Sequence, residues 1–438
     1  MAWNIGANDV ANAMGTSVGS GALTLKQAVL LAAVFEFAGA FFVGGNVAQT
    51  IRQGIVDTDA LRVVAVGSPA TPASNRATTA PRIDQTRSNA EDWWGASAET
   101  NPSGHLYTKL ILGMLAALLA SSIWLNVATY FGQPVSTTHA IVGAVIGFAI
   151  VAAGLHAVVW SKMGAIALSW VISPLVGGVL AFIIYRLVQK YVLSSRHPVF
   201  MAKRALPICF GAVSFIVSLS VLYSVFHVKG SSLLTKVPLA ALCGLVVAFG
   251  ARVVLARKAG NIRVRQGQQY EVVERWFGRI QPVTACYMAF AHGANDVANA
   301  IGPLAGIFHY AGGGTIAGTA PVPFWLLAMG GVGIVVGLST YGYKVMAAVG
   351  KKITEITPTR GFAAEFGTAS TVLVCSLMGL PISTTFVLVG AVMGVGIARG
   401  FGAIDLGVVR KIFASWLITI PASAVLSAVI FSLLIWMV

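Results

Sequence analysis

The octapeptide GANDVANA occurs twice in this chain, at residues 6–13 and again at residues 293–300. Each copy places one Asp and two Asn inside a strongly apolar segment. Because a carboxylate is costly to bury in a membrane, such a residue is retained there for a function. A second pair of segments, residues 132–138 and 379–385, shares the pattern Gly-x-Pro-x-Ser-Thr-Thr. The chain therefore consists of two copies of one unit.

The composition of the chain excludes a soluble globular domain. Hydrophobic residues make up 57% of the 438 residues and charged residues only 10%, whereas a soluble domain has about 25% charged residues. Apolar segments of full or half membrane-spanning length recur along the sequence. They lie at residues 25–50, 108–131, 139–158, 163–187, 205–227, 236–256, 280–308, 322–349, 362–379, 385–398 and 411–438. We expect an all-α, polytopic membrane protein with about 10–12 transmembrane or re-entrant helices.

The two copies predict a division into three parts. Residues 1–185 form the first transmembrane repeat, residues 186–279 a central segment with two spans, and residues 280–438 the second repeat. Much of the net charge of +15 lies in two basic loops of the central segment, which the positive-inside rule places in the cytoplasm. These loops indicate topology and not nucleic-acid binding. The polar stretch 57–107, rich in Pro, Ser, Thr and Asn, is expected to be an irregular external loop.

The repeat also bears on the start of the chain. Met1 aligns with Met288, and the second copy has an apolar lead-in over residues 280–287 that the first copy lacks. Since a spanning helix needs about 20 residues, the repeat predicts that about a dozen residues of the first helix precede Met1 in the natural protein. The alternative is a naturally shortened first helix.

Each Ser-Thr-Thr block predicts a helix break followed by a new helix N-terminus. Pro134 and Pro381 cannot continue the helical hydrogen bonding, and Ser and Thr are good N-cap residues. In a membrane, such a break is tolerated only where it is buried in protein or lines a cavity. Its free N–H groups, hydroxyls and positive dipole end favour an anion; the alternative is a simple kink with hydroxyls bonded to the preceding turn. The predicted anion-binding residues are Ser136, Thr137, Thr138, Ser383, Thr384 and Thr385.

The GANDVANA motifs predict cation ligands. Carboxylate and amide oxygens are hard ligands, which alkali and alkaline-earth cations prefer. The two Asn of each motif are four residues apart and share a helix face, with the Asp beside it. The alternative is that the Asp only caps a broken helix, which would not require both Asn. The candidate residues are Asn8, Asp9, Asn12, Asn295, Asp296 and Asn299.

Two further acids are isolated in apolar segments. Glu36 and Glu365 are functional candidates by the same cost argument, although their spacing shows that they are not equivalent positions of the repeat. Arg360 lies near Glu365, so the alternative for that residue is a place at the edge of a loop.

The paired GANDVANA blocks and the paired Gly-x-Pro-[Val/Ile]-Ser-Thr-Thr blocks resemble the inorganic phosphate transporter (PiT) family, over both halves of the chain. The resemblance implies two inverted-topology repeats and an alternating-access carrier that moves inorganic phosphate with a cation. It places Asp9 and Asp296 at the family's essential acidic positions, Glu36 and Glu365 at its functional glutamates, and the Ser-Thr-Thr residues at its phosphate-contacting tips. The departures are the missing lead-in, the 57–107 loop, and Phe386 in place of His139.

The spelling of the motif looks like the sodium-coupled branch of the family. We therefore expect a multi-pass symporter of the plasma or inner membrane, with sodium held through Asp9 and Asp296 as coupling ion and no other cofactor. Proton-coupled phosphate or sulfate transport is the alternative, and association into homo-oligomers is left open. A membrane-embedded enzyme or receptor is a remote alternative. The best candidate for enzyme chemistry, His292, is replaced by Ile5 in the first copy, and no metal or nucleophile pattern accompanies it.

Overall fold

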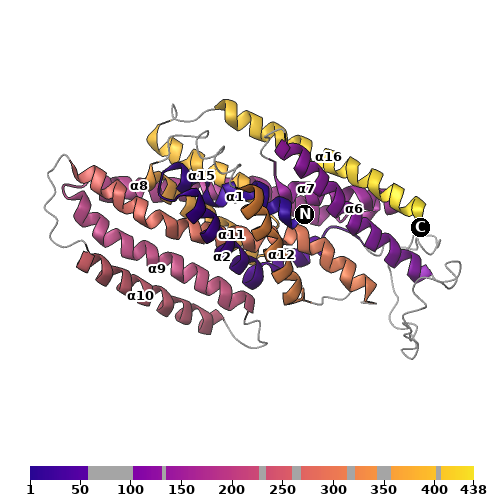
Figure 1. Cartoon of the computed structure of the whole chain (residues 1–438), viewed down its shortest axis with the longest axis horizontal. Coiled ribbons are helices and arrows are strands. Elements are labelled where there is room, and N and C mark those ends of the chain that lie inside the picture. Colours follow the sequence, from indigo (N-terminus) through magenta and orange to yellow (C-terminus); the bar gives the residue numbers. More distant parts are fainter. Residues whose placement is uncertain are drawn as a thin grey trace.

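Helices make up nearly all of the part of the chain that the computed structural model describes, which comprises residues 1–57, 102–130, 135–225, 233–258, 268–312, 321–342, 357–400 and 406–438. The first half contains α1 (Ala2–Gly19), α2 (Leu25–Val43), α3 (Gly45–Gln53), α6 (Pro102–Tyr130), α7 (Thr137–Ala153) and α8 (Trp160–Val188). Helices α9 (Pro198–Val225) and α10 (Leu233–Lys258) follow and pack against each other at one end of the molecule (Figure 1). The second half contains α11 (Gln269–Ala311), α12 (Phe324–Gly337), the π-helical turn η4 (Leu338–Gly342), α14 (Pro358–Leu377), α15 (Thr384–Arg399) and α16 (Leu406–Met437). The expected all-α architecture is confirmed.

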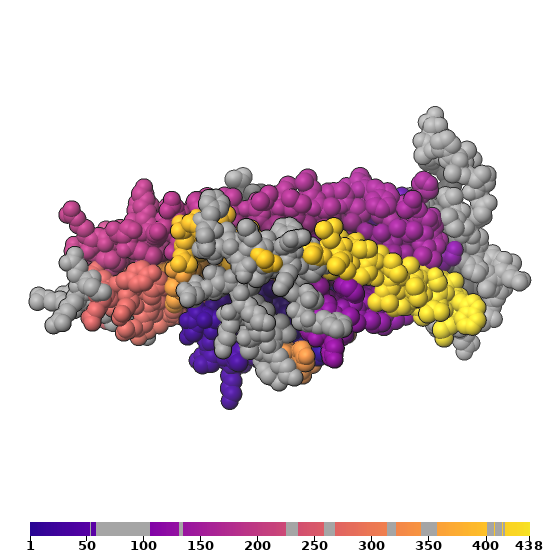
Figure 2. Space-filling model, turned by 90° about the horizontal axis from the view of Figure 1, so that it is seen from above, coloured from indigo at the N-terminus to yellow at the C-terminus, as the bar shows by residue number. Residues whose placement is uncertain are grey.

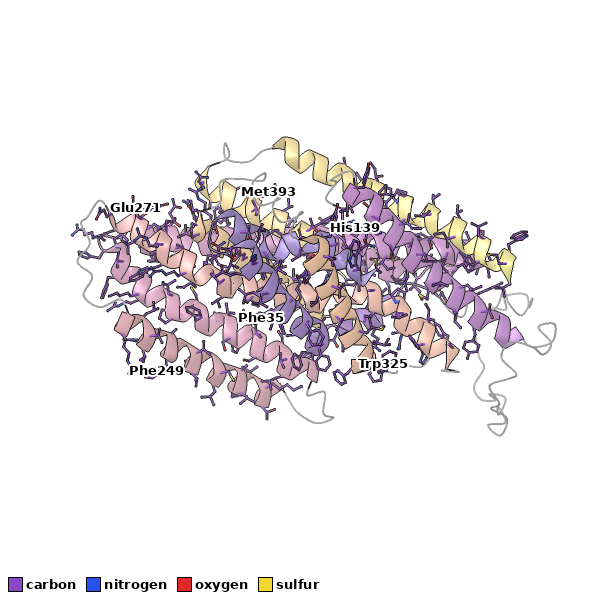
Figure 3. All side chains as sticks on the ribbon, viewed as in Figure 1. Phe35, His139, Phe249, Glu271, Trp325 and Met393 are labelled. Atoms are coloured by element: carbon purple, nitrogen blue, oxygen red, sulfur yellow. The ribbon has the colours of Figure 1, made fainter. Side chains whose placement is uncertain are left out.

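The described helices fit a membrane in the way that the composition predicts. Seven of them are long and apolar enough to cross a bilayer, and their outer faces carry large exposed apolar side chains such as Phe249 on α10 (Figure 3). The helices after the Ser-Thr-Thr blocks, α7 and α15, have only 17 and 16 residues. Helices α1, α11 and α14 are not among the seven because their polar residues lower the mean hydropathy. These three helices carry acids of the predicted site.

The two copies pack crosswise. Helix α7 of the first copy packs against α16 of the second, and α15 of the second packs against α8 of the first. Two further sets of contacts follow the same rule. Helix α2 of the first copy packs against α11 of the second, and α12 of the second packs against α1 of the first. Helix α6 of the first copy likewise packs against α16 of the second, and α14 of the second against α8 of the first. Figure 2 shows α16 lying along the outside of the helices from the first half. Neither copy is a separate body, because each buries its helices against the other.

The structure refines some predicted boundaries. The segment predicted at 25–50 is two helices, since α2 ends at Val43 and α3 begins after Gly44. Helix α6 starts at Pro102, inside the predicted 57–107 loop; residues 58–101 of that loop lie outside the described residues. Helix α11 runs without interruption through the predicted boundary at residues 279 and 280. The division into three parts, and the residues expected before Met1, stay predictions.

The contact between α8 and α15 depends on small residues. A Cβ added at Gly394 would overlap the carbonyl oxygen of Gly178, which is backbone and cannot move aside easily, whereas a Cβ at Gly164 of α8 would meet no atom within 4 Å. We expect Gly394→Ala to destabilise the protein by about 1–3 kcal/mol through overpacking. The control Gly164→Ala should be neutral or slightly stabilising, since Ala favours a helix. Thermal unfolding midpoints in detergent test this, and equal midpoints for the two variants would contradict it.

Candidate functional site

The helices that begin after the Ser-Thr-Thr blocks start inside the protein. Ser136 caps α7 by accepting a hydrogen bond from the backbone N–H of His139 at 3.2 Å, and Ser383 caps α15 by accepting from that of Phe386 at 3.4 Å. Gly379, with φ +69°, ends α14 in the left-handed conformation and lets the chain turn towards Pro381. The predicted N-caps are confirmed, and both cap residues are buried. Pro134 lies outside the described residues.

Each Asn-Asp motif contacts the Ser-Thr-Thr block of the other copy. Asn12 on α1 donates to the Thr385 hydroxyl at 2.8 Å. The matching Asn299 on α11 donates to the hydroxyls of Thr138 at 3.1 Å and Thr137 at 3.3 Å. The two copies thus close a single site between them, with a helix N-terminus and an Asn-Asp motif from each.

The N-terminal ends of α7 and α15 also meet directly. The Thr138 hydroxyl donates to the carbonyl oxygen of Ile382 at 3.0 Å, and Asn295 donates to that same oxygen at 2.7 Å. Thr384 donates to Oδ2 of Asp296 at 2.8 Å. All six predicted Ser and Thr residues are buried here, so the positive ends of both half-length helices point into one water-poor region.

Asp9 and Asp296 lie in the same cluster. Together with His292 they offer ligand atoms that all lie within 4.8 Å of one another. Oδ1 of Asp9 accepts from Asn8 at 3.2 Å and Asn12 at 3.4 Å. Its Oδ2 has no donor with hydrogen-bond geometry among the described residues, although Thr137 is its neighbour. Oδ1 of Asn299 is likewise buried without a donor.

Buried oxygens without a hydrogen-bond donor are unusual in proteins. Burial removes their hydrogen bonds to water, and the free energy of those bonds is lost unless another group replaces them. Both of these atoms are acceptors, so a cation can satisfy either of them, whereas a further carboxylate or carbonyl cannot. Carboxylate and amide oxygens are hard ligands that suit sodium. The residues present therefore fit an alkali cation.

Glu36 reaches this cluster through His292, which the sequence offered only as a candidate for enzyme chemistry. Nδ1 of His292 lies 3.1 Å from Glu36 Oε1, and its Nε2 lies 2.8 Å from Asp296 Oδ2. These are ion-pair distances without the alignment of a hydrogen bond, and all three side chains are fully buried. The spacing of four between His292 and Asp296 on one helix was the available signal; the partner Glu36 is distant in sequence.

Glu365 forms a second cluster, away from the Asp residues. Its Oε1 accepts from Thr16 at 2.5 Å, Ser17 at 2.6 Å and Gln281 at 3.2 Å, and its Oε2 accepts from Thr284. Among the described residues it has no hydrogen bond or ion pair with either Asp. Glu365 is fully buried, so the alternative of a loop-edge residue is wrong. Its carboxylate joins α1 to α11, the two helices that carry the Asn-Asp motifs.

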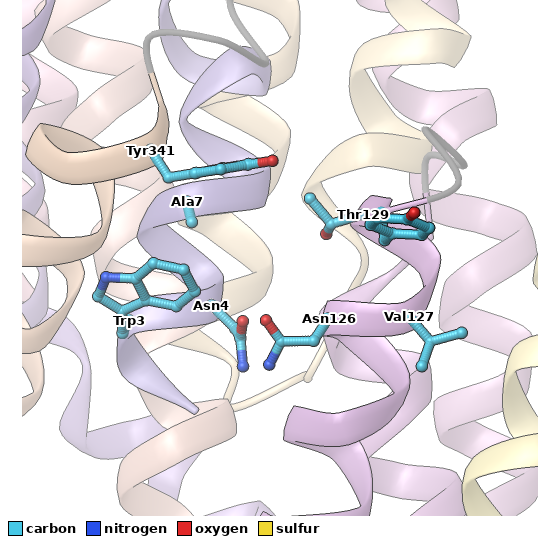
Figure 4. A pocket seen from close by; sticks show the side chains of 8 residues that line it. Trp3, Asn4, Ala7, Asn126, Val127, Thr129 and Tyr341 are labelled. Carbon is cyan, nitrogen blue, oxygen red and sulfur yellow. The ribbon is translucent and has the colours of Figure 1, made fainter.

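A cavity of about 430 Å³ opens beside the first motif. Figure 4 shows Asn4 and Asn126 facing each other across it. Its lining consists of Trp3, Asn4 and Ala7 of α1, of Asn126, Val127, Thr129 and Tyr130 of α6, and of Tyr341. Thr129 on its wall donates to Asn8 at 3.3 Å. The matching contact in the second copy, from Ser376 to Asn295 at 3.4 Å, is fully buried. The cavity therefore approaches the site from the side of the first copy.

Comparison with known proteins agrees with this arrangement. A family described as the phosphate transporter family matches residues 5–427. The chain belongs to that family. It is 42% identical to a protein of Pyrococcus abyssi named "Putative phosphate permease", over 100% of this chain and 96% of the relative. It is 41% identical to the chloroplastic inorganic phosphate transporter 2-1 of Arabidopsis thaliana, over 98% of this chain and 69% of the relative.

The fold agrees as well. A solved structure described as the sodium-dependent phosphate transporter matches with a TM-score of 0.84 and 38% identity, covering 100% of this chain and 97% of that one. The protein is therefore a multi-span membrane transporter and not an enzyme, and the remote alternative of an embedded enzyme is excluded.

Proposed function

We propose that this transporter carries inorganic phosphate together with sodium ions across the cell membrane. The observation that supports it most is the crosswise contact of each Asn-Asp motif with the other copy's half-length helix, through Asn12–Thr385 and Asn299–Thr138. It joins hard oxygen ligands and helix N-termini in one buried site. The solved relative that matches this fold is itself described as sodium-dependent.

The N-termini of α7 and α15 supply the anion-binding half of this proposal. The first backbone N–H groups of a helix have no partner within it, and the helix dipole adds a positive potential at that end. Two such ends converge on the site, together with the hydroxyls of Thr137 and Thr384. A tetrahedral oxyanion such as phosphate suits several donors that approach from opposite sides.

The two Asp carboxylates explain why a cation is required for phosphate binding in this proposal. A phosphate anion beside Asp9 and Asp296 would be repelled strongly in a region of low dielectric. Sodium at the unpaired oxygens of Asp9 and Asn299 removes that repulsion and favours phosphate binding after sodium. Binding of either ion then strengthens binding of the other, which favours their transport together.

Movement across the membrane is proposed to follow from the two-copy architecture. We infer that the copies have inverted topology and move against each other around the shared site, as in other transporters built from such repeats. The cavity next to Asn8 and the buried equivalent at Asn295 suit a state that is accessible from one side only. The proposed location is the plasma or inner membrane, and self-association stays open.

Radiolabelled phosphate uptake into proteoliposomes tests the proposal. At fixed pH, an inward sodium gradient should accelerate uptake several-fold over an equal potassium gradient, because the sodium gradient supplies the driving force. Collapsing the sodium gradient with an ionophore should remove the acceleration. An uptake rate that is the same with a sodium gradient as with a potassium gradient would contradict the proposal.

The same preparation separates the alternatives. Uptake driven by an inward proton gradient without sodium would assign proton coupling. Inhibition by excess sulfate, together with uptake of labelled sulfate, would assign a wider anion specificity. Arsenate has the size and charge of phosphate and serves as the positive control for competition.

A further inference from the structure

The cavity beside the first motif has a pair of amide side chains that the second copy does not repeat. Asn4 and Asn126 face each other across it (Figure 4). The repeated motifs align Asn4 with Ala291, and the Ser-Thr-Thr blocks align Asn126 with Leu373. Neither Ala nor Leu has a polar side-chain atom. The chain therefore carries this amide pair on one side of the site only.

Hydrogen bonding fixes the orientation of both amides. Nδ2 of Asn4 donates to the carbonyl oxygen of Ser122 at 3.2 Å, and Nδ2 of Asn126 donates to the same oxygen at 2.9 Å. A carbonyl oxygen can only accept, so both NH2 groups face Ser122 and both amide oxygens point away from it. Figure 4 shows the two amide oxygens on the same side of the pair. The pair thus presents two acceptor oxygens together.

The aromatic part of the cavity wall also suits a cation. The rings of Trp3 and Tyr341 line the cavity, with their centroids 6.3 Å apart. An aromatic ring attracts a cation that lies against its face. The indole N–H of Trp3, which would repel a cation, donates to the Thr340 hydroxyl at 2.9 Å. The described lining residues include no charged side chain, so nothing among them would hold a cation tightly.

Polar atoms continue from the amide pair to the proposed sodium site. Asn4, Asn8 and Asn12 follow one another at intervals of four residues on α1, so they share one face, about 5–6 Å apart along the helix. Thr129, on the cavity wall, donates to Asn8 at 3.3 Å, and Asn8 donates to Asp9 at 3.2 Å. An ion at the amide pair is therefore about one helical turn from the first motif.

The geometry points to a separate entry subsite, at which the amide oxygens of Asn4 and Asn126 hold a sodium ion before it reaches Asp9. The inference rests on the proposed sodium coupling and extends it. Amide oxygens are hard ligands, and two neutral ones bind the ion weakly enough to release it. The cavity of about 430 Å³ also has room for water ligands, each of which occupies about 30 Å³. The subsite replaces part of the hydration shell and thereby speeds the capture of sodium at Asp9.

Equilibrium exchange of labelled phosphate tests the inference. Proteoliposomes contain the same sodium and phosphate concentrations on both sides, so the measurement does not depend on the side to which the cavity opens. Exchange rates over a series of sodium concentrations give kcat and kcat/KM for sodium. Asn4→Ala with Asn126→Leu gives the cavity the residues of the second copy. It should lower kcat/KM for sodium several-fold and leave kcat close to the wild-type value. If the double variant does not fold, Asn126→Leu alone should change kcat/KM in the same direction.

Asn126→Asp distinguishes ion binding from a structural role. Like Asn126→Leu, it removes the hydrogen bond to Ser122, but it keeps the oxygens and adds a negative charge at about pH 8. Because negative charge raises the local concentration of cations, kcat/KM for sodium should rise several-fold. Gln189→Leu is the control: it removes an amide at the C-terminal end of α8, outside the cavity, and should leave both constants unchanged.

The outcomes separate the subsite from sodium coupling itself. Opposite changes in kcat/KM for Asn126→Leu and Asn126→Asp support the subsite. Changes in the same direction, or no change in either variant, overturn it and leave sodium coupling intact, provided that exchange by the wild type requires sodium. Exchange by the wild type at the same rate without sodium overturns both proposals.

Discussion

Asp9→Asn and Asp296→Asn should each abolish sodium-driven phosphate uptake in a protein that still folds and inserts. Asp9 carries the unpaired oxygen at which sodium is proposed to bind. Asp296 lies in the same cluster and holds the Thr384 hydroxyl at the start of α15. Mutating a residue that only hydrogen-bonds to a metal ligand lowers the affinity for the metal by about 10–100-fold. Removing the negative charge of a carboxylate in the site should therefore lower the affinity for sodium by at least about 100-fold.

The change to Asn keeps the size of the side chain, which makes a folding defect a poor explanation for lost uptake. Glu274→Gln is the matched control: it also exchanges a carboxylate for an amide, but Glu274 contacts Thr359 at the start of α14 and lies outside the site. This variant should transport at close to the wild-type rate. Uptake near normal in both Asp variants would contradict the assigned site.

The main features of the fold and site could be predicted from the repeated motifs. Hydropathy placed the helices, because a membrane span needs a long apolar run. Pro381 and Ser383 predicted the break before α15 and its N-cap, since both effects are local to a few residues. The repeat showed that Asp9 and Asp296 are equivalent, and the structure places them together.

What the sequence could not supply is the set of contacts between distant segments. From the sequence, His292 was considered only as a candidate for enzyme chemistry, with Ile5 in its place in the first copy. Only the packing of α2 on α11 shows that Glu36 faces it. Likewise, the sequence grouped Glu36 with Glu365, whereas the structure separates them into two clusters. Spacing along one helix predicts a shared face but not the residue opposite it.

Glu365→Ala is expected to be the most destabilising change among the candidate residues. The carboxylate accepts from Thr16 and Ser17 of α1 and from Gln281 and Thr284 of α11, so its removal leaves four buried donors without their acceptor. Hydrogen bonds to a charged group contribute about 1.5–3 kcal/mol each, and the loss of several should exceed about 3 kcal/mol even after the hydroxyls rotate to other acceptors. Uptake should fall with it, since α1 and α11 are no longer held together beside the site.

Two further variants distinguish loss of the hydrogen bonds to Glu365 from the general effect on stability of a substitution in α14. Glu365→Gln keeps the size and one acceptor oxygen. With that oxygen at the place of Oε1, its NH2 group faces the Thr284 hydroxyl, so its thermal midpoint should lie between those of Glu365→Ala and the wild type. Thr368→Val, one turn away and equally buried, removes a hydroxyl bonded only to the Ala364 carbonyl of its own helix and should have little effect. Thermal unfolding midpoints of the three variants and the wild type, measured in detergent at one heating rate, give their order of stability. If Glu365→Ala unfolds at the wild-type temperature, the carboxylate does not hold the two motif helices together.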